Sequence, residues 1–205
     1  MADTRTQVVF EEDKAALETA ANALRAGQVI AFPTDTVYGL GAKVTNPAAI
    51  ERLYEIKGRD PAKPIAVLIG DAAQLTQLSD EVSPQAAQYA AAFWPGALTL
   101  VLKKRPELPA ALTTTMNVGI RMPAHAFALE LMRMTGALAT TSANLSGGEN
   151  CITAAQVLAQ LGGRIPLIID GGACPTAIPS TVVDCTTTPP RVLREGAISP
   201  AQLGL

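Results

Sequence analysis

Positively charged side chains stand close together in one short stretch of this sequence, where they could bind an anion. Lys57 and Arg59 are separated only by Gly58, and Lys63 follows four residues later. Lysine and arginine are the side chains with which proteins hold phosphate and carboxylate groups. The alternative is that the first two cations only stabilise the end of a helix, because the helix dipole favours positive charge there.

Hydroxyl and amide side chains gather in two further segments, each after an apolar run that predicts a buried strand. Residues 33–41 follow the apolar residues 29–32, and residues 140–148 follow residues 137–140. Loops at the strand ends of α/β sheets commonly carry ligands. The same residue types are typical of turns in which side chains bond to their own backbone, so both interpretations stay open. The candidate side chains are Thr34, Thr36, Tyr38, Thr140, Ser142 and Asn144.

Two arginines interrupt apolar stretches that predict strands. Arg121 lies in residues 118–123 and Arg194 in residues 191–195. Burying a charge is costly unless it is paired; the alternative is that each arginine lies on the exposed face of its strand. The net charge of the chain is only −2, so cations gathered on loops and strand ends would form a focused anion site. Such a site fits a polyphosphate better than a nucleic-acid backbone.

Common catalytic and targeting signals are absent. Gly39 and Gly41 are followed by Val44, where a dinucleotide fingerprint needs a third glycine, and neither a Walker-type phosphate loop nor a Gly-x-Ser-x-Gly elbow occurs. The single histidine, His125, stands near an expected helix start, which favours a surface or first-turn role over catalysis. Residues 1–7 lack the apolar core of a signal peptide, and no segment approaches a membrane span. The cysteines have the spacing of reduced thiols, which favours a cytoplasmic location: Cys151, Cys174 and Cys185.

The elements that must position these residues follow the alternating pattern of one α/β domain over residues 1–205. Because 48% of the residues are hydrophobic, the chain is expected to bury a sizeable core. Only 4% of the residues are aromatic, so few side chains are available to stack on nucleic-acid bases. A Thr-Thr-Pro-Pro turn between the last two strands indicates a mixed sheet. The sequence predicts helices over residues 13–27 (with Asp13 as N-cap), 46–57, 83–93, 124–135 and 153–161, and strands over 29–32, 65–69, 98–102, 118–123, 137–140, 167–170, 180–185 and 191–195.

These same segments, in this order, resemble the YrdC-like family of threonylcarbamoyl-adenylate synthases. Each block alone is a weak signal, but their shared order from Pro33 to Gly196 is specific. The blocks are Pro33-Thr34-Asp35-Thr36-Val37-Tyr38-Gly39-Leu40, Lys57-x-Arg59, Trp94-Pro95-Gly96-x-Leu98-Thr99, Arg121-x-Pro123, Ser142-Ala143-Asn144, Pro179-Ser180-Thr181-Val182-Val183-Asp184 and Arg194-x-Gly196.

The resemblance implies an α/β fold in which a twisted mixed sheet with flanking helices surrounds an open cavity. It implies a nucleotidyltransferase that converts L-threonine, bicarbonate and ATP into threonylcarbamoyl-AMP and pyrophosphate. That product serves N6-threonylcarbamoyladenosine formation at position 37 of tRNA, through downstream threonylcarbamoyl-transferase proteins. Mg²⁺ would enter with ATP, and the resemblance identifies no metal ligand among the protein side chains.

The resemblance also carries roles to individual residues. Lys57 and Arg59 are the expected catalytic residues, in contact with the phosphates of ATP. The wider expected ATP site comprises Lys57, Arg59, Lys63, Asn117, Ser142, Asn144, Asn150 and Arg194. The expected threonine site comprises Thr34, Thr36, Tyr38, Arg121, Thr140 and Ser180, with Arg121 suited to the carboxylate by a bidentate pair.

The sequence also departs from the family pattern. Asp60 precedes Pro61 where members often have proline directly after the arginine, and Leu68 stands where a histidine is expected, which bears on one threonine contact. The chain resembles the short form of the family. The alternative function is an RNA- or tRNA-binding module of the same fold without synthase activity, with weak binding. A hydrogenase-maturation domain of this fold is disfavoured, because the zinc-finger-like cysteines of those longer chains are missing.

Overall fold

The computed structural model describes residues 5–205; residues 1–4, part of the segment in which we expect no signal peptide, lie outside the described residues. The strands are β1 (Gln7–Phe10), β2 (Ile30–Phe32), β3 (Gly39–Lys43), β4 (Ala66–Leu68), β5 (Leu98–Lys103), β6 (Asn117–Arg121), β7 (Leu138–Ser142), β8 (Leu167–Asp170), β9 (Thr181–Asp184) and β10 (Arg191–Arg194). The α-helices are α1 (Ala16–Arg25), α2 (Pro47–Lys57), α3 (Pro84–Phe93), α4 (Ala126–Thr135), α5 (Ala154–Leu161) and α6 (Pro200–Leu203). Two 3₁₀ turns, η1 (Ala72–Gln77) and η2 (Ala110–Leu112), complete the order.

Helix α2 places the cationic stretch, and local sequence signals define both of its ends. The side chain of Asn46 accepts a hydrogen bond from the backbone N–H of Ala49, and Pro47 occupies the first helical position. Gly58 ends the helix with a φ of 58°, a left-handed conformation that glycine adopts readily. Lys57 is therefore the last residue of the helix, and Arg59 begins the loop that leads to β4.

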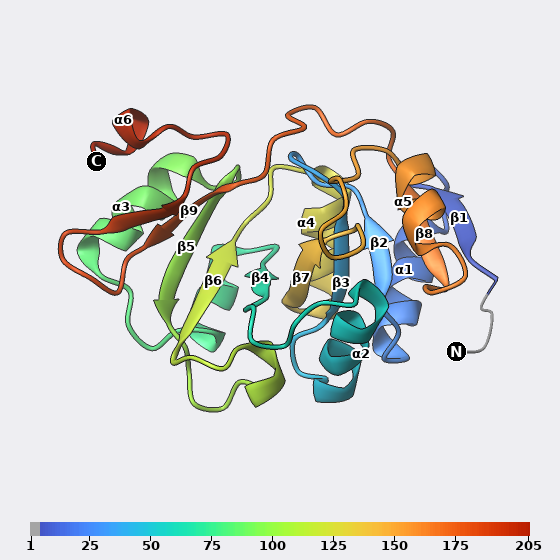
Figure 1. Cartoon of the computed structure of the whole chain (residues 1–205), viewed down its shortest axis with the longest axis horizontal. Coiled ribbons are helices and arrows are strands. Elements are labelled where there is room, and N and C mark those ends of the chain that lie inside the picture. Colours follow the sequence, from blue (N-terminus) through green and yellow to red (C-terminus); the bar gives the residue numbers. More distant parts are fainter. Residues whose placement is uncertain (1–4) are drawn as a thin grey trace.

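One mixed, twisted sheet contains all ten described strands, in the order β1-β8-β2-β3-β7-β4-β6-β5-β9-β10 (Figure 1). Strands β8 and β2 pair in parallel, and so do β4 with β6 and β5 with β9. The central strands β3, β7 and β4 pair antiparallel, and β9 and β10 form an antiparallel hairpin. The expected mixed α/β fold is confirmed.

Helices cover both faces of the sheet, with α2 and α5 in front and α1 and α4 behind in Figure 1. Strand β2 shows the division, because Ala31 packs in the cluster that contains α2 and α5, whereas Ile30 and Phe32 pack in the cluster of α1 and α4. Alternate residues of a strand point to opposite faces of the sheet, so this buried strand of three residues contributes side chains to the hydrophobic cores on both faces.

Several elements differ from the sequence prediction, which does not include the strand β3 or the helix α6. Helix α1 begins at Ala16 with Ala15 as N-cap and no side-chain capping bond, so the prediction of Asp13 as N-cap was wrong. Asp13 instead accepts the backbone N–H of Ala16 at its own carbonyl, in a turn that precedes the helix. The edge strand β1 was not predicted from the sequence; it pairs with β8, far along the chain.

Candidate functional site

A cavity of about 600 Å³ lies over the middle of the sheet. Its lining comes from the sheet strands, the loop before β3, the loop after α2 and the segment that leads into β9. The lining residues are Thr34, Thr36, Val37, Tyr38, Gly39, Arg59, Pro64, Ile65, Ala66, Leu68, Thr99, Val101, Gly119, Arg121, Thr140, Thr141, Ser142, Asn150, Pro179, Ser180, Val182, Leu193 and Arg194.

The floor of the cavity is built from small side chains on one face of adjacent strands. Ala66 of β4 stands opposite Thr140 of β7, and Gly119 of β6 stands opposite Val101 of β5. A Cβ atom added to Gly119 would lie 3.1 Å from the Thr99 methyl carbon and 3.8 Å from the Ala66 Cβ. The absence of larger side chains at these positions leaves the space above the sheet open.

Arg121 is the buried cation of the site. Only 6% of the surface of Arg121 is exposed. The Nε atom donates to the carbonyl of Gly96 at 2.9 Å, Nη1 donates to Oγ1 of Thr36 at 2.9 Å, and Nη2 donates to Oδ1 of Asp35 at 2.5 Å. Burial lowers the pKa of Arg121, and the Asp35 carboxylate opposes that shift. The ion pair with Asp35 explains how a charge is tolerated at the end of an apolar strand.

The segment that contains Asp35 is folded as a hydroxyl-stabilised turn. Oγ1 of Thr34 donates to the carbonyl of Val37 at 2.6 Å and accepts the backbone N–H of Thr36. The Tyr38 hydroxyl donates to the carbonyl of Gly172 at 2.8 Å, and burial raises the pKa of Tyr38 well above its ordinary value. Thr36 and Arg121 are thus brought together at the cavity, while the hydroxyls of Thr34 and Tyr38 are engaged with protein backbone.

Arg59 and Arg194 also line the cavity, and neutral oxygens hold them in place. Arg59 donates to the carbonyls of Lys63 and Pro64. Arg194 donates twice to the carbonyl of Ser180, at 3.1 Å from Nε and 2.7 Å from Nη2. Among the described residues, no carboxylate lies within salt-bridge distance of either side chain.

Lys57 points away from the cavity, into the loop after β7. Its ammonium donates to the carbonyls of Ser142 and Asn144, both at 2.6 Å, and to Oδ1 of Asn144 at 3.3 Å. The amide nitrogen of Asn144 in turn donates to the carbonyls of Leu145 and Gly148. Lys57 and Asn144 are buried and do not line the cavity. The three ammonium protons already have protein acceptors, so Lys57 supports the end of β7 and the loop that follows it, which carry Ser142 and Asn150.

The other residues expected at the site fall into two groups. Thr140, Ser142, Asn150 and Ser180 line the cavity, and the buried hydroxyl of Ser180 lies 2.8 Å from that of Thr99. Lys63 and Asn117 do not line it. The side chain of Lys63 is exposed, and Asn117 begins β6 at the opposite end of that strand from Arg121. The roles expected for all of these residues stay predictions.

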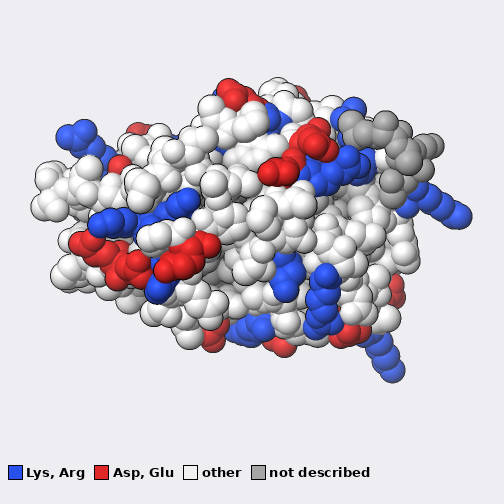
Figure 2. Space-filling view, turned by 90° about the horizontal axis from the view of Figure 1, so that it is seen from below, with Lys and Arg blue, Asp and Glu red and all other residues white. Residues whose placement is uncertain are grey.

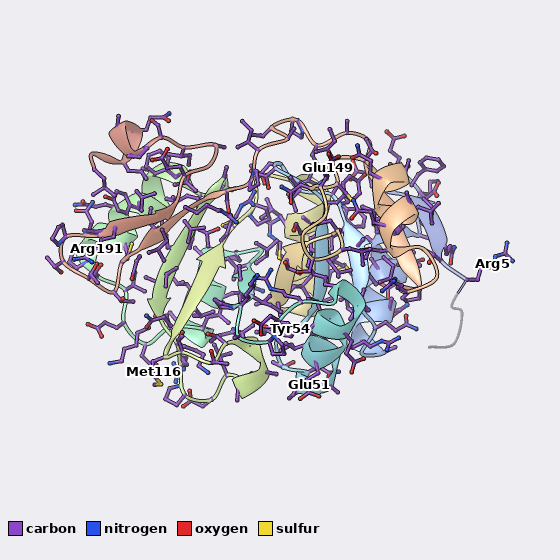
Figure 3. The ribbon with its side chains drawn as sticks, in the orientation of Figure 1. Arg5, Glu51, Tyr54, Met116, Glu149 and Arg191 are labelled. Carbon is purple, nitrogen blue, oxygen red and sulfur yellow. The ribbon has the colours of Figure 1, made fainter. Side chains whose placement is uncertain are left out.

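Other charged residues lie outside the cavity. Arg191, on the same strand as Arg194, lies at the outer edge of the molecule (Figure 3). His125 is the N-cap residue of α4 and makes no capping bond; its Nε2 is 3.7 Å from a carboxylate oxygen of Glu11. Within residues 5–205, no three His, Cys, Asp or Glu side chains form a group that could hold a metal ion.

Gly119→Leu is expected to fill the cavity without unfolding the protein. The new side chain would extend from the floor into the open space, next to the movable methyl group of Thr99. We expect at least a tenfold loss of affinity for any ligand that spans the floor, about 1.4 kcal/mol. Binding measured by calorimetry checks this. Gly119→Ala adds only the Cβ atom and is the control; equal affinity in both variants would contradict the role of the floor.

The fold and the site define a class: an α/β protein whose mixed sheet carries a cavity lined by arginines and hydroxyl side chains. Comparison with known proteins gives the family. The Sua5/YciO/YrdC family model, described as "Telomere recombination", matches residues 22–196. The chain belongs to this family, and the resemblance read from its sequence is confirmed.

Individual relatives agree with this assignment. The chain is 41% identical over 184 residues to threonylcarbamoyl-AMP synthase of Pyrococcus abyssi and 43% identical over 187 residues to that of Bacillus subtilis. These alignments cover 89% and 90% of the chain and 54% of each relative, so the chain spans about half the length of these relatives. A crystal structure of Pyrococcus abyssi Sua5 complexed with L-threonine superimposes with a TM-score of 0.93 at 38% identity, over 98% of this chain and 60% of that one.

Proposed function

We propose that the chain is a threonylcarbamoyl-AMP synthase, which forms threonylcarbamoyl-AMP and pyrophosphate from L-threonine, bicarbonate and ATP for tRNA N6-threonylcarbamoyladenosine formation. The carrying observation is a cavity lined by three arginines in a chain 41–43% identical to proteins of that name. The product would pass to downstream threonylcarbamoyl-transferase proteins in the cytoplasm. In the described part of the chain, none of the helices has the length and apolar character needed to cross a bilayer.

The proposed reaction needs positioning and charge neutralisation more than covalent catalysis. The threonine amine and bicarbonate give a carbamate with loss of one water molecule, and an oxygen of the carbamate attacks the α-phosphate of ATP while pyrophosphate leaves. Arg121 would hold the threonine carboxylate, with Thr36, Thr140 and Ser180 around it. Arg59, Arg194, Ser142 and Asn150 would face the nucleotide and its phosphates.

Mg²⁺ and Lys57 have the remaining roles in this proposal. Mg²⁺ would arrive with ATP and neutralise phosphate charge, which is consistent with polar cavity residues that are mostly hydroxyls and arginines. Lys57 would act through the loop after β7 rather than by touching phosphate, because its N–H groups already point at protein oxygens.

The RNA-binding alternative has less support. Acidic and basic side chains are interspersed on the face shown in Figure 2, rather than gathered in a basic stripe. Nucleic-acid binding depends on clustered phosphate contacts. Salt-sensitive tRNA binding without threonine-dependent pyrophosphate release would favour this alternative.

The proposed reaction is tested by incubating the chain with ATP, Mg²⁺, bicarbonate and L-threonine. Pyrophosphate and the adenylate are expected together, and omission of threonine or bicarbonate should stop both. Retained pyrophosphate release without threonine would contradict the proposal.

Arg59→Ala should reduce adenylate formation by about 100-fold or more, because a cation facing developing phosphate charge stabilises the transition state. Steady-state rates of pyrophosphate release measure the effect. Arg52→Ala is the matched control: Arg52 lies on α2, its one ion pair among the described residues is with Glu55 on the surface, and it does not line the cavity. Equal activity of the two variants would remove Arg59 from the site.

A further inference from the structure

The three arginines of the cavity differ in how their charge is balanced. Arg121 pairs with the carboxylate of Asp35, whereas Arg59 and Arg194 have only carbonyl and hydroxyl acceptors among the described residues. The electrostatic fields of two opposite charges in contact largely cancel for a group farther away, so the Arg121–Asp35 pair carries little net charge. Arg59 and Arg194 keep their positive charge for a ligand.

Asp35 contacts the guanidinium without lining the cavity. Its Oδ1 accepts from Nη2 of Arg121 and from the backbone N–H of Ala124 at 3.0 Å, which holds it between the start of the 33–38 turn and the segment before α4. The Asp35 residue is 8% exposed and is not among the lining residues. It therefore acts on a ligand only through Arg121.

The orientation of Arg121 leaves part of the guanidinium for a ligand. A guanidinium has five N–H groups, and Gly96, Thr36 and Asp35 take one each from Nε, Nη1 and Nη2. One N–H on each terminal nitrogen has no protein acceptor among the described residues. Because Arg121 lines the cavity, these are the donors that a ligand carboxylate would use.

Arg194 and Arg121 line the same cavity, and the positive charge of Arg194 lowers the pKa of Arg121. Two arginines on the wall of one cavity form a ready site for a polyphosphate when neither is neutralised. Asp35 is the only carboxylate of the described residues within salt-bridge distance of this arginine pair.

We propose that Asp35 is a positioning and selectivity residue: it fixes the fork of Arg121 and cancels its charge, so that this part of the cavity takes a zwitterionic amino acid and rejects polyphosphate. An amino acid has no net charge and can exchange into a neutral region at little electrostatic cost. A phosphate anion gains more at Arg59 and Arg194. The inference deepens the proposed function, on which it rests for the identity of the two ligands.

Asp35→Asn tests the inference, because asparagine keeps the shape and the acceptor oxygen but removes the charge. Pyrophosphate binding is measured by calorimetry at constant ionic strength, together with thermal unfolding as pyrophosphate is added. We expect Asp35→Asn to bind pyrophosphate at least tenfold more tightly than the unaltered chain. Its unfolding temperature should rise more steeply with pyrophosphate, and pyrophosphate should now displace L-threonine.

Two controls separate this effect from simpler ones. Asp13→Asn removes the same charge at an exposed site whose side chain makes no hydrogen bond within residues 5–205, and should leave pyrophosphate affinity unchanged. Asp35→Glu keeps the charge and displaces the carboxylate, so it should weaken L-threonine binding while pyrophosphate affinity stays low.

Equal pyrophosphate affinity in Asp35→Asn and Asp13→Asn would overturn the proposal. An Asp35→Asn chain that stays unfolded in saturating pyrophosphate would also overturn the proposal. Pyrophosphate should bind the arginine that has lost its partner and thereby stabilise the folded state. These measurements require no turnover. A failed synthase assay with the expected pyrophosphate shift would reject the proposed reaction and leave the role of Asp35 in place.

Discussion

Arg121→Met is expected to abolish threonine-dependent adenylate formation and to destabilise the fold. The variant lacks the two N–H groups of Arg121 that would donate to the threonine carboxylate. Two charge-assisted hydrogen bonds at about 1.5 kcal/mol each correspond to a loss of threonine affinity of about 100-fold or more. The carboxylate of Asp35 is left buried with the N–H of Ala124 as its remaining donor. Breaking one side of a buried ion pair costs about 3–5 kcal/mol.

Two measurements check the result. Denaturant unfolding gives the loss of stability, and the KM for L-threonine compared with that for ATP locates the loss of binding. Arg121→Lys keeps the charge near Asp35 but cannot present a planar fork, so it should recover part of the stability and little of the threonine affinity. An unchanged KM for threonine in Arg121→Met would refute the assignment of the carboxylate to this residue.

Elements with local signals could be predicted from the sequence. Helix α2 is the clearest case, since Asn46 caps its start and Gly58 ends it at the residue where the sequence indicated. The same holds for the helices that begin after Ser83 and Thr153, whose side chains accept backbone N–H groups. These signals depend on a few adjacent residues, so no tertiary information is needed to recognise them.

Features that depend on distant contacts could not be predicted in the same way. Strand β1 has four residues without clear alternation, and it exists because β8 offers a parallel edge more than 150 residues later. Asp35 and Arg121 are 86 positions apart, and no spacing rule links them. The signal that the sequence offers is that an arginine in an apolar strand needs a partner, and Asp35 lies in one of the two candidate loop segments, residues 33–41.

The direction of Lys57 is the most instructive difference at the site. Its spacing from Arg59 makes both look like ligands of one anion, but the helix ends between them. Lys57 turns into the loop after β7, and Arg59 faces the cavity. Residue type and spacing indicated the right neighbourhood, whereas the position of the helix end places Arg59, and not Lys57, in the lining of the cavity.

Lys57→Met is expected to reduce adenylate formation by about 100-fold while the protein stays folded near neutral pH. The carbonyls of Ser142 and Asn144 lose the Lys57 ammonium as a donor, so the end of β7 and the loop after it, which carry Ser142 and Asn150, shift. Misplacement by about 1 Å can cost a factor of this size. Because the effect passes through the loop, Lys57→Met and Asn144→Ala should be non-additive in kcat/KM. Additive effects would show that Lys57 contacts the substrate itself.

The stability difference between the unaltered chain and Lys57→Met should depend on pH in a defined direction. Burial, followed by the positive charge of Arg59, lowers the pKa of Lys57 from 10.5 to about 8. Between these values the unfolded chain holds a proton at Lys57 that the folded chain lacks, so the free energy of unfolding rises with pH, by about 3 kcal/mol over the window. Methionine removes this rise. Near neutral pH the lost hydrogen bonds and the removed buried charge nearly offset each other, so Lys57→Met should be about as stable as the unaltered chain. Because only the unaltered chain gains stability as the pH rises, the destabilisation caused by Lys57→Met should grow from pH 8 to 10. Denaturant unfolding across that range measures it, and a constant difference between the two proteins would mean that Lys57 keeps its ordinary pKa.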